Sequence, residues 1–260
     1  MTAEWNPAGY QRISGLQRQM AHEALALITL EGIERVLDVG CGQGAITAQI
    51  AGRVPHGSVV GVDPSHDMID YATAHFAADH PNLRFAVADA RRLPFDDAFD
   101  VVVSFNALHW IPEQGPALRS IRRALRPRGR ALLRLVTRGP RKSLETVVEE
   151  TRKAPRWQAA FADFTDPYLR LTAEQYATAA AGNGFRVLRE VTADKAWDFG
   201  SREAFFAFCA VGLVAWTSRL PEAGRTAFVD DVLERYAAAG DDDAGTTFRF
   251  YQTDVTLAPA

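Results

Sequence analysis

The sequence predicts an α/β protein with a doubly wound, mostly parallel sheet of seven strands and an inserted helical cap. Three observations support this prediction. Short apolar strands alternate with helices from residue 35 to residue 136, a glycine-rich turn follows the first strand, and two further strands flank a helical stretch near the end. Strands separated by helices of ten or more residues form right-handed crossovers, which give parallel strands with helices on both faces.

The first half of the chain supplies five of the strands. A first helix is expected at 14–30, because Leu16, Met20 and Leu27 are apolar at helical spacing. The strands are then expected at 35–39, 58–62, 83–88, 99–105 and 130–136, and the helices among them at 44–53, 65–78 and 113–125. This half therefore predicts a cofactor-binding α/β core with an N-terminal helix.

Helices dominate beyond residue 137. They are expected at 143–153, 157–164, 172–182, 201–216 and 222–239, with strands at 185–192 and 246–257. The predicted division is a core at 1–137, a helical cap at 138–183 and 200–240, and final core strands at 184–199 and 241–260. Such a cap covers the carboxyl ends of the parallel strands, where open α/β sheets bind ligands.

Length and composition restrict the class of protein. A chain of 260 residues with 47% hydrophobic residues can bury a full core in one elaborated domain. The net charge of -3 provides no basic field for nucleic acid. Cys41 and Cys209 lack metal-site spacing, so we expect reduced thiols and no metal. No signal peptide is visible and the apolar run at 205–216 is too short to cross a bilayer, which predicts a cytoplasmic protein with no membrane partner.

A ligand site is predicted at the turn after the first strand, where Gly40, Gly42 and Gly44 alternate. Glycines allow positive φ and leave room for a ligand, and the N–H groups that open the next helix face that room. A tight turn without a ligand is the alternative interpretation. The turn contains no lysine, which a P-loop requires, so a nucleoside triphosphate is disfavoured.

The acids beside the turn narrow the choice of ligand. Asp63 ends the second strand, where an acid holds ribose hydroxyls in nicotinamide sites. The GxGxxG/A pattern of those sites is met only weakly, by Gly40, Gly42 and Ala45. Asp38 directly precedes the glycines, and a carboxylate there suits a positively charged ligand better than a pyrophosphate. A sulfonium with an amino-acid tail meets this requirement.

Segments 36–44 and 59–65 resemble the first two motifs of the class I S-adenosylmethionine-dependent methyltransferases, whose sheet is Rossmann-like. In the second motif the acid, here Asp63, binds both ribose hydroxyls. Met68 stands where this family often packs a side chain on adenine. Asp89 resembles the acid of the third motif, which accepts a hydrogen bond from the adenine amino group.

Two later segments, 99–104 and 125–130, resemble the remaining motifs in the same order. The resemblance implies S-adenosylmethionine as the cofactor and S-adenosylhomocysteine as the product. It also implies a set of cofactor-binding residues: Asp38, Gly40, Gly42, Gly44, Asp63, Met68, Asp89, Ala90 and Asn106.

The methyl acceptor is predicted from Leu-Gln-Arg at 16–18 and Leu-His-Trp at 108–110. These segments are similar to a subgroup that methylates carboxylates, which includes the juvenile hormone acid, malonyl-carrier-protein and trans-aconitate methyltransferases. The resemblance implies that Gln17 and Trp110 hold the acceptor carboxylate. The chemistry of its side chain makes His109 a further candidate donor. A carboxylic acid with a pKa near ~4 is already ionised and needs no base. Aromatic residues are concentrated in the expected cap, which favours an apolar acid.

Other hypotheses stay open. A phenol, an amine or an activated carbon is the acceptor if His109 acts as a general base. Gln17, His109 and Trp110 also suit purely structural roles. A non-catalytic cofactor-binding protein is a third hypothesis, which the presence of all three acids disfavours. Arginines between 119 and 130 leave a carrier-protein partner as a minor alternative. Residues 106–109 replace the Asn/Asp-Pro-Pro-Tyr/Phe motif of nucleic-acid and protein methyltransferases.

Overall fold

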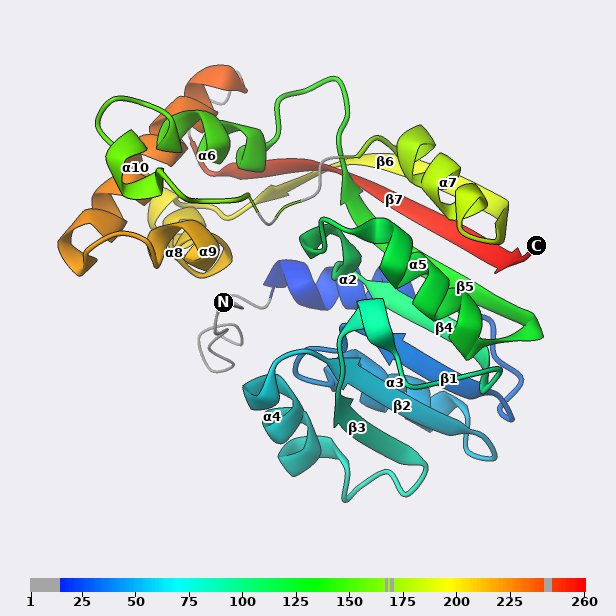
Figure 1. Ribbon diagram of the computed structural model, residues 1–260. Coiled ribbons are helices and arrows are strands. Elements are labelled where there is room, and N and C mark those ends of the chain that lie inside the picture. Colours follow the sequence, from blue (N-terminus) through cyan, green and yellow to red (C-terminus); the bar gives the residue numbers. More distant parts are fainter. Residues whose placement is uncertain (1–14, 167, 169–170, 241–244) are drawn as a thin grey trace.

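The computed structural model describes residues 15–166, 168, 171–240 and 245–260, and its centre is a seven-stranded sheet. The strand order is β3-β2-β1-β4-β5-β7-β6 (Figure 1). The strands span Arg35–Val39 (β1), Ser58–Asp63 (β2), Leu83–Val87 (β3), Phe99–Phe105 (β4), Leu125–Thr137 (β5), Phe185–Asp198 (β6) and Thr247–Pro259 (β7). Neighbouring strands from β3 to β5 are parallel, whereas β7 is antiparallel to both β5 and β6. The predicted fold class is confirmed.

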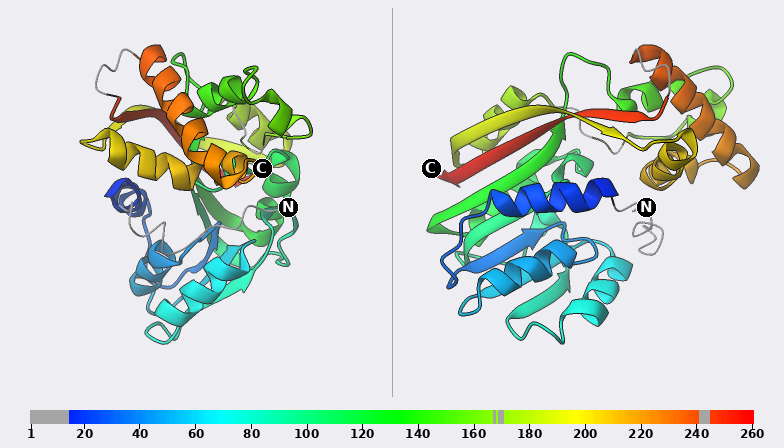
Figure 2. Two further views of the ribbon diagram at one scale, coloured as in Figure 1. Left: turned by 90° about the vertical axis from the view of Figure 1, so that its left-hand side faces the viewer. Right: turned by 180° about the vertical axis from the view of Figure 1, so that it is seen from behind.

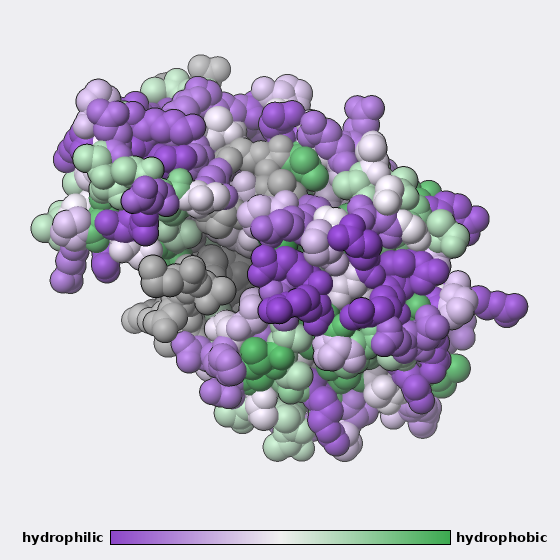
Figure 3. Space-filling view, viewed as in Figure 1, coloured by the Kyte–Doolittle hydropathy of each residue, from purple (hydrophilic) through white to green (hydrophobic). Residues whose placement is uncertain are grey.

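Helices cover both faces of the sheet. On one face, α2 (Gly15–Ala26) packs beside α3 (Ala45–Arg53), and α3 contacts α4 (His66–Phe76). On the other face, α5 (Gln114–Ala124) contacts α7 (Ala173–Gly182). The outer surface of α5 is hydrophilic in the space-filling view (Figure 3). The sheet is therefore doubly wound, as its alternating sequence predicts.

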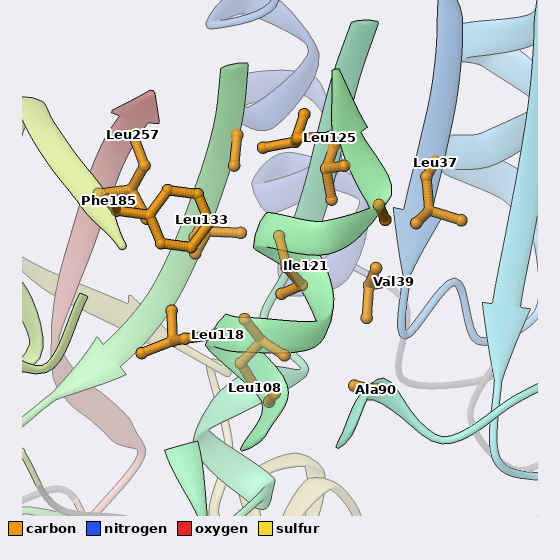
Figure 4. Packing of buried hydrophobic residues seen from close by; sticks show 14 of the residues in the cluster. Leu37, Val39, Ala90, Leu108, Leu118, Ile121, Leu125, Leu133, Phe185 and Leu257 are labelled. Atoms are coloured by element: carbon orange, nitrogen blue, oxygen red, sulfur yellow. The ribbon is translucent and has the colours of Figure 1, made fainter. Parts of the chain in front are cut away.

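The alternation of side chains along β1 decides which residues face which helices. Leu37 and Val39 lie in the apolar cluster that includes Leu118 of α5 (Figure 4). Val36 lies in the cluster on the opposite face, with residues of α2 and α3. Asp38 has the same parity as Val36, so its side chain is directed toward α3.

The cap is a separate apolar cluster at one end of the molecule (Figure 2). Its helices are α6 (Leu144–Arg152), α8 (Arg202–Gly212), α9 (Val214–Thr217) and α10 (Glu222–Ala239). Phe248 and Phe250 at the start of β7 join this cluster, so the long ribbon of β6 and β7 extends from the core sheet into the cap. No helix in the described ranges is long and apolar enough to cross a membrane.

One helix of the predicted cap belongs to the core instead. The expected cap range 138–183 includes α7, but α7 packs on β6 and α5. Tyr176 and Ala180 of this helix lie in the core cluster. Assigning α7 to the cap was therefore wrong, because an amphipathic pattern shows that a helix is half-buried but not what covers it. The rest of the predicted division stays a proposal.

Several element boundaries differ from the prediction. β5 begins at Leu125, which pairs with Phe99 of β4 before the register shifts. β6 continues to Asp198, because antiparallel pairing with β7 lasts to that residue. The helix predicted at 201–216 is interrupted at Leu213 and forms α8 and α9. The helix predicted at 157–164 is only the short 3-10 helix η3, Gln158–Phe161.

Candidate cofactor and acceptor site

The glycine turn joins β1 to α3 and lies against the tip of β2. Gly40, Gly42 and Gly44 have positive φ values of 78°, 52° and 82°. The N–H of Gly40 donates to the carbonyl of Val62 at 2.8 Å. A side chain at Gly40 would lie 2.2 Å from Cβ of Ala107, whereas no described residue would come within 4 Å of one at Gly42. The turn thus combines a close backbone contact with open space at its centre.

Asp38 is a buried carboxyl group next to this turn. Its side chain is 2% exposed, and the hydroxyl of Thr47 on α3 donates to its Oδ2 at 2.7 Å. Burial raises the pKa of Asp38 to about 7; the Thr47 hydrogen bond opposes this rise and the charge of Asp63 adds to it. No cation among the described residues contributes to this pKa. A positively charged ligand would therefore stabilise the ionised form of Asp38 strongly.

Asp63 at the end of β2 holds the turn in place. Its Oδ2 accepts the N–H of Gly42 at 3.1 Å, and its Oδ1 accepts the N–H of Ser65 at 3.0 Å. Burial raises the pKa of Asp63, while these two hydrogen bonds lower it. Each carboxylate oxygen has a further lone pair. Asp63 can therefore accept hydrogen bonds from two ligand hydroxyls without releasing the turn.

Met68, Asp89 and Ala90 come from the next two connections of the sheet. Met68 is 6% exposed in the first turn of α4. Asp89 caps the 3-10 helix η1 (Ala90–Arg92), and Ala90 is buried. The guanidinium of Arg91 lies 2.7 Å from the Asp89 carboxylate and holds the pKa of that carboxyl below its ordinary value. The sequence did not reveal Arg91 as the partner of the acid predicted to bind adenine.

Asn106 follows β4 in a left-handed conformation, with φ of 57°. Its N–H donates to the carbonyl of Arg134 at 2.9 Å, and its Oδ1 accepts from Nε2 of Gln252 at 3.4 Å. Gln252 comes from β7 and is 1% exposed. Its Oε1 has no hydrogen-bond partner among the described residues. Gln252 was not predicted from the sequence, because nothing in the chain order places a residue of β7 near the segment that follows β4.

His109 lies in the short 3-10 helix η2 (Leu108–Trp110), directly after β4. Gln114 fixes this segment, since its Nε2 donates to the carbonyls of Leu108 and Ile111 at 2.6 Å each. His109 is 5% exposed, and its Nδ1 accepts the N–H of Val136 at 3.3 Å. Burial lowers the pKa of His109 to about 3. At neutral pH the imidazole is therefore uncharged, with its proton on Nε2.

Trp110 faces the cap. Its ring centroid lies 5.2 Å from that of Tyr168 and 6.4 Å from that of Trp216, and the indole packs against the cap cluster. Gln17 lies in α2, but its side chain is outside the described residues, so its contact with an acceptor stays a prediction. Leu16 beside it packs into the same cap cluster as Trp216. His109, Trp110 and the start of α2 therefore meet where the core joins the cap.

A surface groove lies away from this site. This groove of about 550 Å³ lies at the amino ends of β4 and β5, whereas the glycine turn lies at the carboxyl ends of the parallel strands. Its lining includes Asp100 and Arg126, which pair at 2.6 Å. In the described part of the chain, no group of three or more His, Cys, Asp and Glu residues could hold a metal ion.

The residues at the tips of β1 and β2 fit a cationic nucleoside. The buried carboxyl of Asp38 has no cation beside it in the described ranges, Asp63 has unused lone pairs, and the space next to Gly42 is open. The sheet is the doubly wound, mostly parallel one that the sequence predicts, with β7 inserted antiparallel between β5 and β6. Together the fold and the site define a class I methyltransferase, whose cofactor is S-adenosylmethionine.

Comparisons with known proteins agree with this class. Residues 36–129 match the family model of the methyltransferase domain. Trans-aconitate 2-methyltransferase of Methylobacterium radiotolerans is 37% identical over 127 residues, which cover 49% of this chain and 47% of that enzyme. The 235L protein of Invertebrate iridescent virus 6 is 25% identical over 232 residues, or 89% of this chain and 85% of that protein. The chain thus spans about half the length of its trans-aconitate methyltransferase relatives.

A solved structure extends the similarity to the whole fold. The BH2331 protein of Bacillus halodurans C-125 superposes with a TM-score of 0.67 over 92% of this chain and 99% of that one, at 18% identity. At this identity the likeness shows the shared fold alone. The matched domain and the trans-aconitate methyltransferase relatives support an S-adenosylmethionine-dependent methyltransferase. The predicted class, enzyme type and cofactor are confirmed.

Proposed function

We propose that this enzyme transfers the methyl group of S-adenosylmethionine to the carboxylate of a small apolar acid. The observation that carries the proposal is the environment of His109, whose burial lowers its pKa to about 3. A phenol has a pKa near ~10, so proton transfer from it to this imidazole would be unfavourable by about seven pK units. A carboxylic acid is already ionised at neutral pH and requires no proton transfer.

The cofactor roles in this proposal follow the positions of the acids. S-adenosylmethionine, when bound, supplies the electrophilic methyl group. Asp38 faces its cationic amino-acid tail, and Asp63 accepts from the ribose hydroxyls. Met68 and Asp89 contact the adenine, with Ala90, Asn106 and the three glycines completing the walls. The buried, raised-pKa state of Asp38 and the unused lone pairs of Asp63 support this arrangement.

The acceptor roles follow from the donors near the cap. In-line displacement at a sulfonium needs an aligned nucleophile and the exclusion of water. The Nε2–H of His109 and the indole N–H of Trp110 suit the orientation of one carboxylate oxygen, and Gln17 is proposed as a third donor. Gln114 keeps the backbone of His109 and Trp110 rigid through its two hydrogen bonds.

The apolar character of the acid is inferred from the cap. Trp110 packs against a cluster whose members include Trp216, Phe164 and Tyr168. Aromatic walls of this kind favour an apolar or aromatic tail. The relatives that are named trans-aconitate 2-methyltransferases support the acceptor class, because their named substrate carries carboxylates.

Product chemistry tests the proposal directly. Purified enzyme and methyl-labelled cofactor are incubated with trans-aconitate, phenylacetate, cinnamate and decanoate, followed by mild alkali. We expect label in methyl esters that alkali releases. His109→Gln should keep kcat within about tenfold, because this residue donates a hydrogen bond but transfers no proton. Alkali-stable products, together with a loss of about 10³-fold or more in His109→Gln, would contradict the proposal and favour a phenol or amine acceptor with a base.

A further inference from the structure

A charged network centred on the buried Arg134 lies between α2 and the last three strands of the sheet. Arg134 of β5 is 3% exposed, and its guanidinium binds both carboxylate oxygens of Asp254 on β7, at 2.7 and 3.0 Å. Arg134 and Asp254 stand directly opposite each other in the β5–β7 register. A bidentate pair in this setting is fixed in geometry by both strands.

The remaining donors of Arg134 reach α2. Its Nη1 donates to the carbonyl of Met20 at 3.0 Å and lies 3.5 Å from the carboxylate of Glu23. Glu23 also pairs with Lys195 of β6. Burial alone would raise the pKa of Glu23, but the hydrogen bond from Lys195 and the nearby charges hold it below its ordinary value. Glu23 thereby links α2 to β5 and β6, and Arg134 extends this link to Asp254 of β7.

α2 connects the core and the cap through its apolar residues. Ala24 and Leu25 near its end lie with Val36 and Leu132 in the apolar cluster on the α3 face of the sheet. Leu16 near its start lies in the cap cluster, and Met20 packs against that cluster. The view from behind shows α2 beside the sheet with its first turn toward the cap (Figure 2, right). The network joins α2 midway between these two contacts.

Arg134 also touches the site through its backbone. Its carbonyl accepts the N–H of Asn106, directly after β4. Three residues further along the chain lies His109, whose ring centroid is 5.1 Å from that of Tyr168 in the cap cluster. The residue that holds α2 is therefore also a hydrogen-bond partner of the segment that leads to the proposed acceptor donors.

We propose that Arg134 is a positioning residue that fixes α2 as a wall of the acceptor site, with Glu23 and Lys195 as its partners. This inference rests on the proposed acceptor role of the core–cap junction. The acids proposed for the cofactor lie on β1, β2 and the segment after β3, away from β5, β6 and β7. Asn106 contacts Arg134 through backbone atoms, which neither substitution below alters. Loosening α2 should therefore weaken acceptor binding and leave cofactor binding unchanged.

Glu23→Gln is the first test, because it removes the charge and keeps the size of the side chain. Hydrogen exchange of the described α2 amides should become about tenfold faster. KM for the panel acid that is methylated should rise about three- to tenfold, while kcat and the affinity for S-adenosylhomocysteine stay within about twofold. The matched control is Glu150→Gln, which breaks the exposed Lys142–Glu150 pair in the cap and should change none of these quantities.

Arg134→Lys is the second test, since it keeps the charge but loses the bidentate fork and the bond to Met20. Exchange of α2 should be faster than in Glu23→Gln, and KM should rise further. Unchanged exchange in both variants would overturn the inference, whether or not any acid is methylated. Faster exchange with an unchanged KM would show a purely structural role for Arg134 and overturn the inference as well. The same holds if exchange is faster but the affinity for decanoate, measured by tryptophan fluorescence, is unchanged. Absence of methyl esters with all panel acids would count against the proposed function, and the exchange and decanoate measurements would then still decide the inference.

Discussion

Replacing Asp38 by asparagine should make the ligand-free enzyme increasingly stable relative to wild type as pH rises. The folded chain raises the pKa of Asp38 from 3.8 to about 7, chiefly by burial. A carboxyl group with a raised pKa keeps its proton in the folded state after the unfolded chain has lost it. Its contribution to stability therefore falls as pH rises from about 4 to about 7 and stays low above that.

The size of the effect follows from the shift. The free-energy cost of Asp38 relative to a neutral side chain is about 1.5 kcal/mol at pH 5 and about 4 kcal/mol at pH 8. Asparagine keeps the shape but brings an amide N–H₂ that costs roughly 1–3 kcal/mol if it finds no acceptor. That second cost is independent of pH. The stability of Asp38→Asn relative to wild type should thus improve by about 2–3 kcal/mol between pH 5 and pH 8.

Urea unfolding of the ligand-free proteins at pH 5, 6, 7 and 8 measures this difference. Calorimetric titration with S-adenosylmethionine should show weaker binding by Asp38→Asn than by wild type, because the variant lacks the charge proposed to face the cofactor. Glu150→Gln, on an exposed pair, serves as the control for general pH effects. Parallel stability profiles for wild type and Asp38→Asn would refute the reasoning, since Asp38 would then not titrate as a buried group.

Three further outcomes are expected. The affinity of wild type for S-adenosylmethionine should rise as pH increases from 6 to about 7 and then level off, because binding favours ionised Asp38; titration calorimetry should find no such rise in Asp38→Asn. Gly40→Ala should weaken cofactor binding at least about tenfold by the same method, because the new Cβ would lie 2.2 Å from that of Ala107 at a φ of 78°. Trp216→Phe loses the hydrogen bond from its indole N–H to Glu149, 2.9 Å in length, and should lower Tm by roughly 4–10 °C in a thermal scan.

The parallel half of the fold was predictable because its information is local. β4 was predicted with its observed bounds, and α3 and α4 differ from their predicted ranges only at their ends. The same locality holds for Asp38, Gly42 and Asp63, which the order of two strands brings together. The hydrophobic period and the turn glycines that predict these features lie within a few residues of them in the sequence.

The features that were missed depend on contacts between distant segments. Gln252 reaches Asn106 only because β7 enters the sheet between β5 and β6. Likewise, Arg134 had no reason in sequence to be buried, since its partner Asp254 lies on that same inserted strand. A pattern of apolar residues identifies a half-buried helix such as α7 but cannot name its partner. Arg91 was missed for a different reason: its side chain is exposed, and the sequence does not show whether an exposed arginine pairs with an acid two residues away.

The order of β7 and β6 at the edge of the sheet has a consequence for folding. β6 pairs with β7 alone, and α8, α9 and α10 all lie in the connection between the two strands. The parallel strands can associate through local crossovers, whereas β6 must wait until this long connection has closed. Cap and edge strand should therefore be acquired together, as one late cooperative unit added to an early nucleus that already contains the glycine turn.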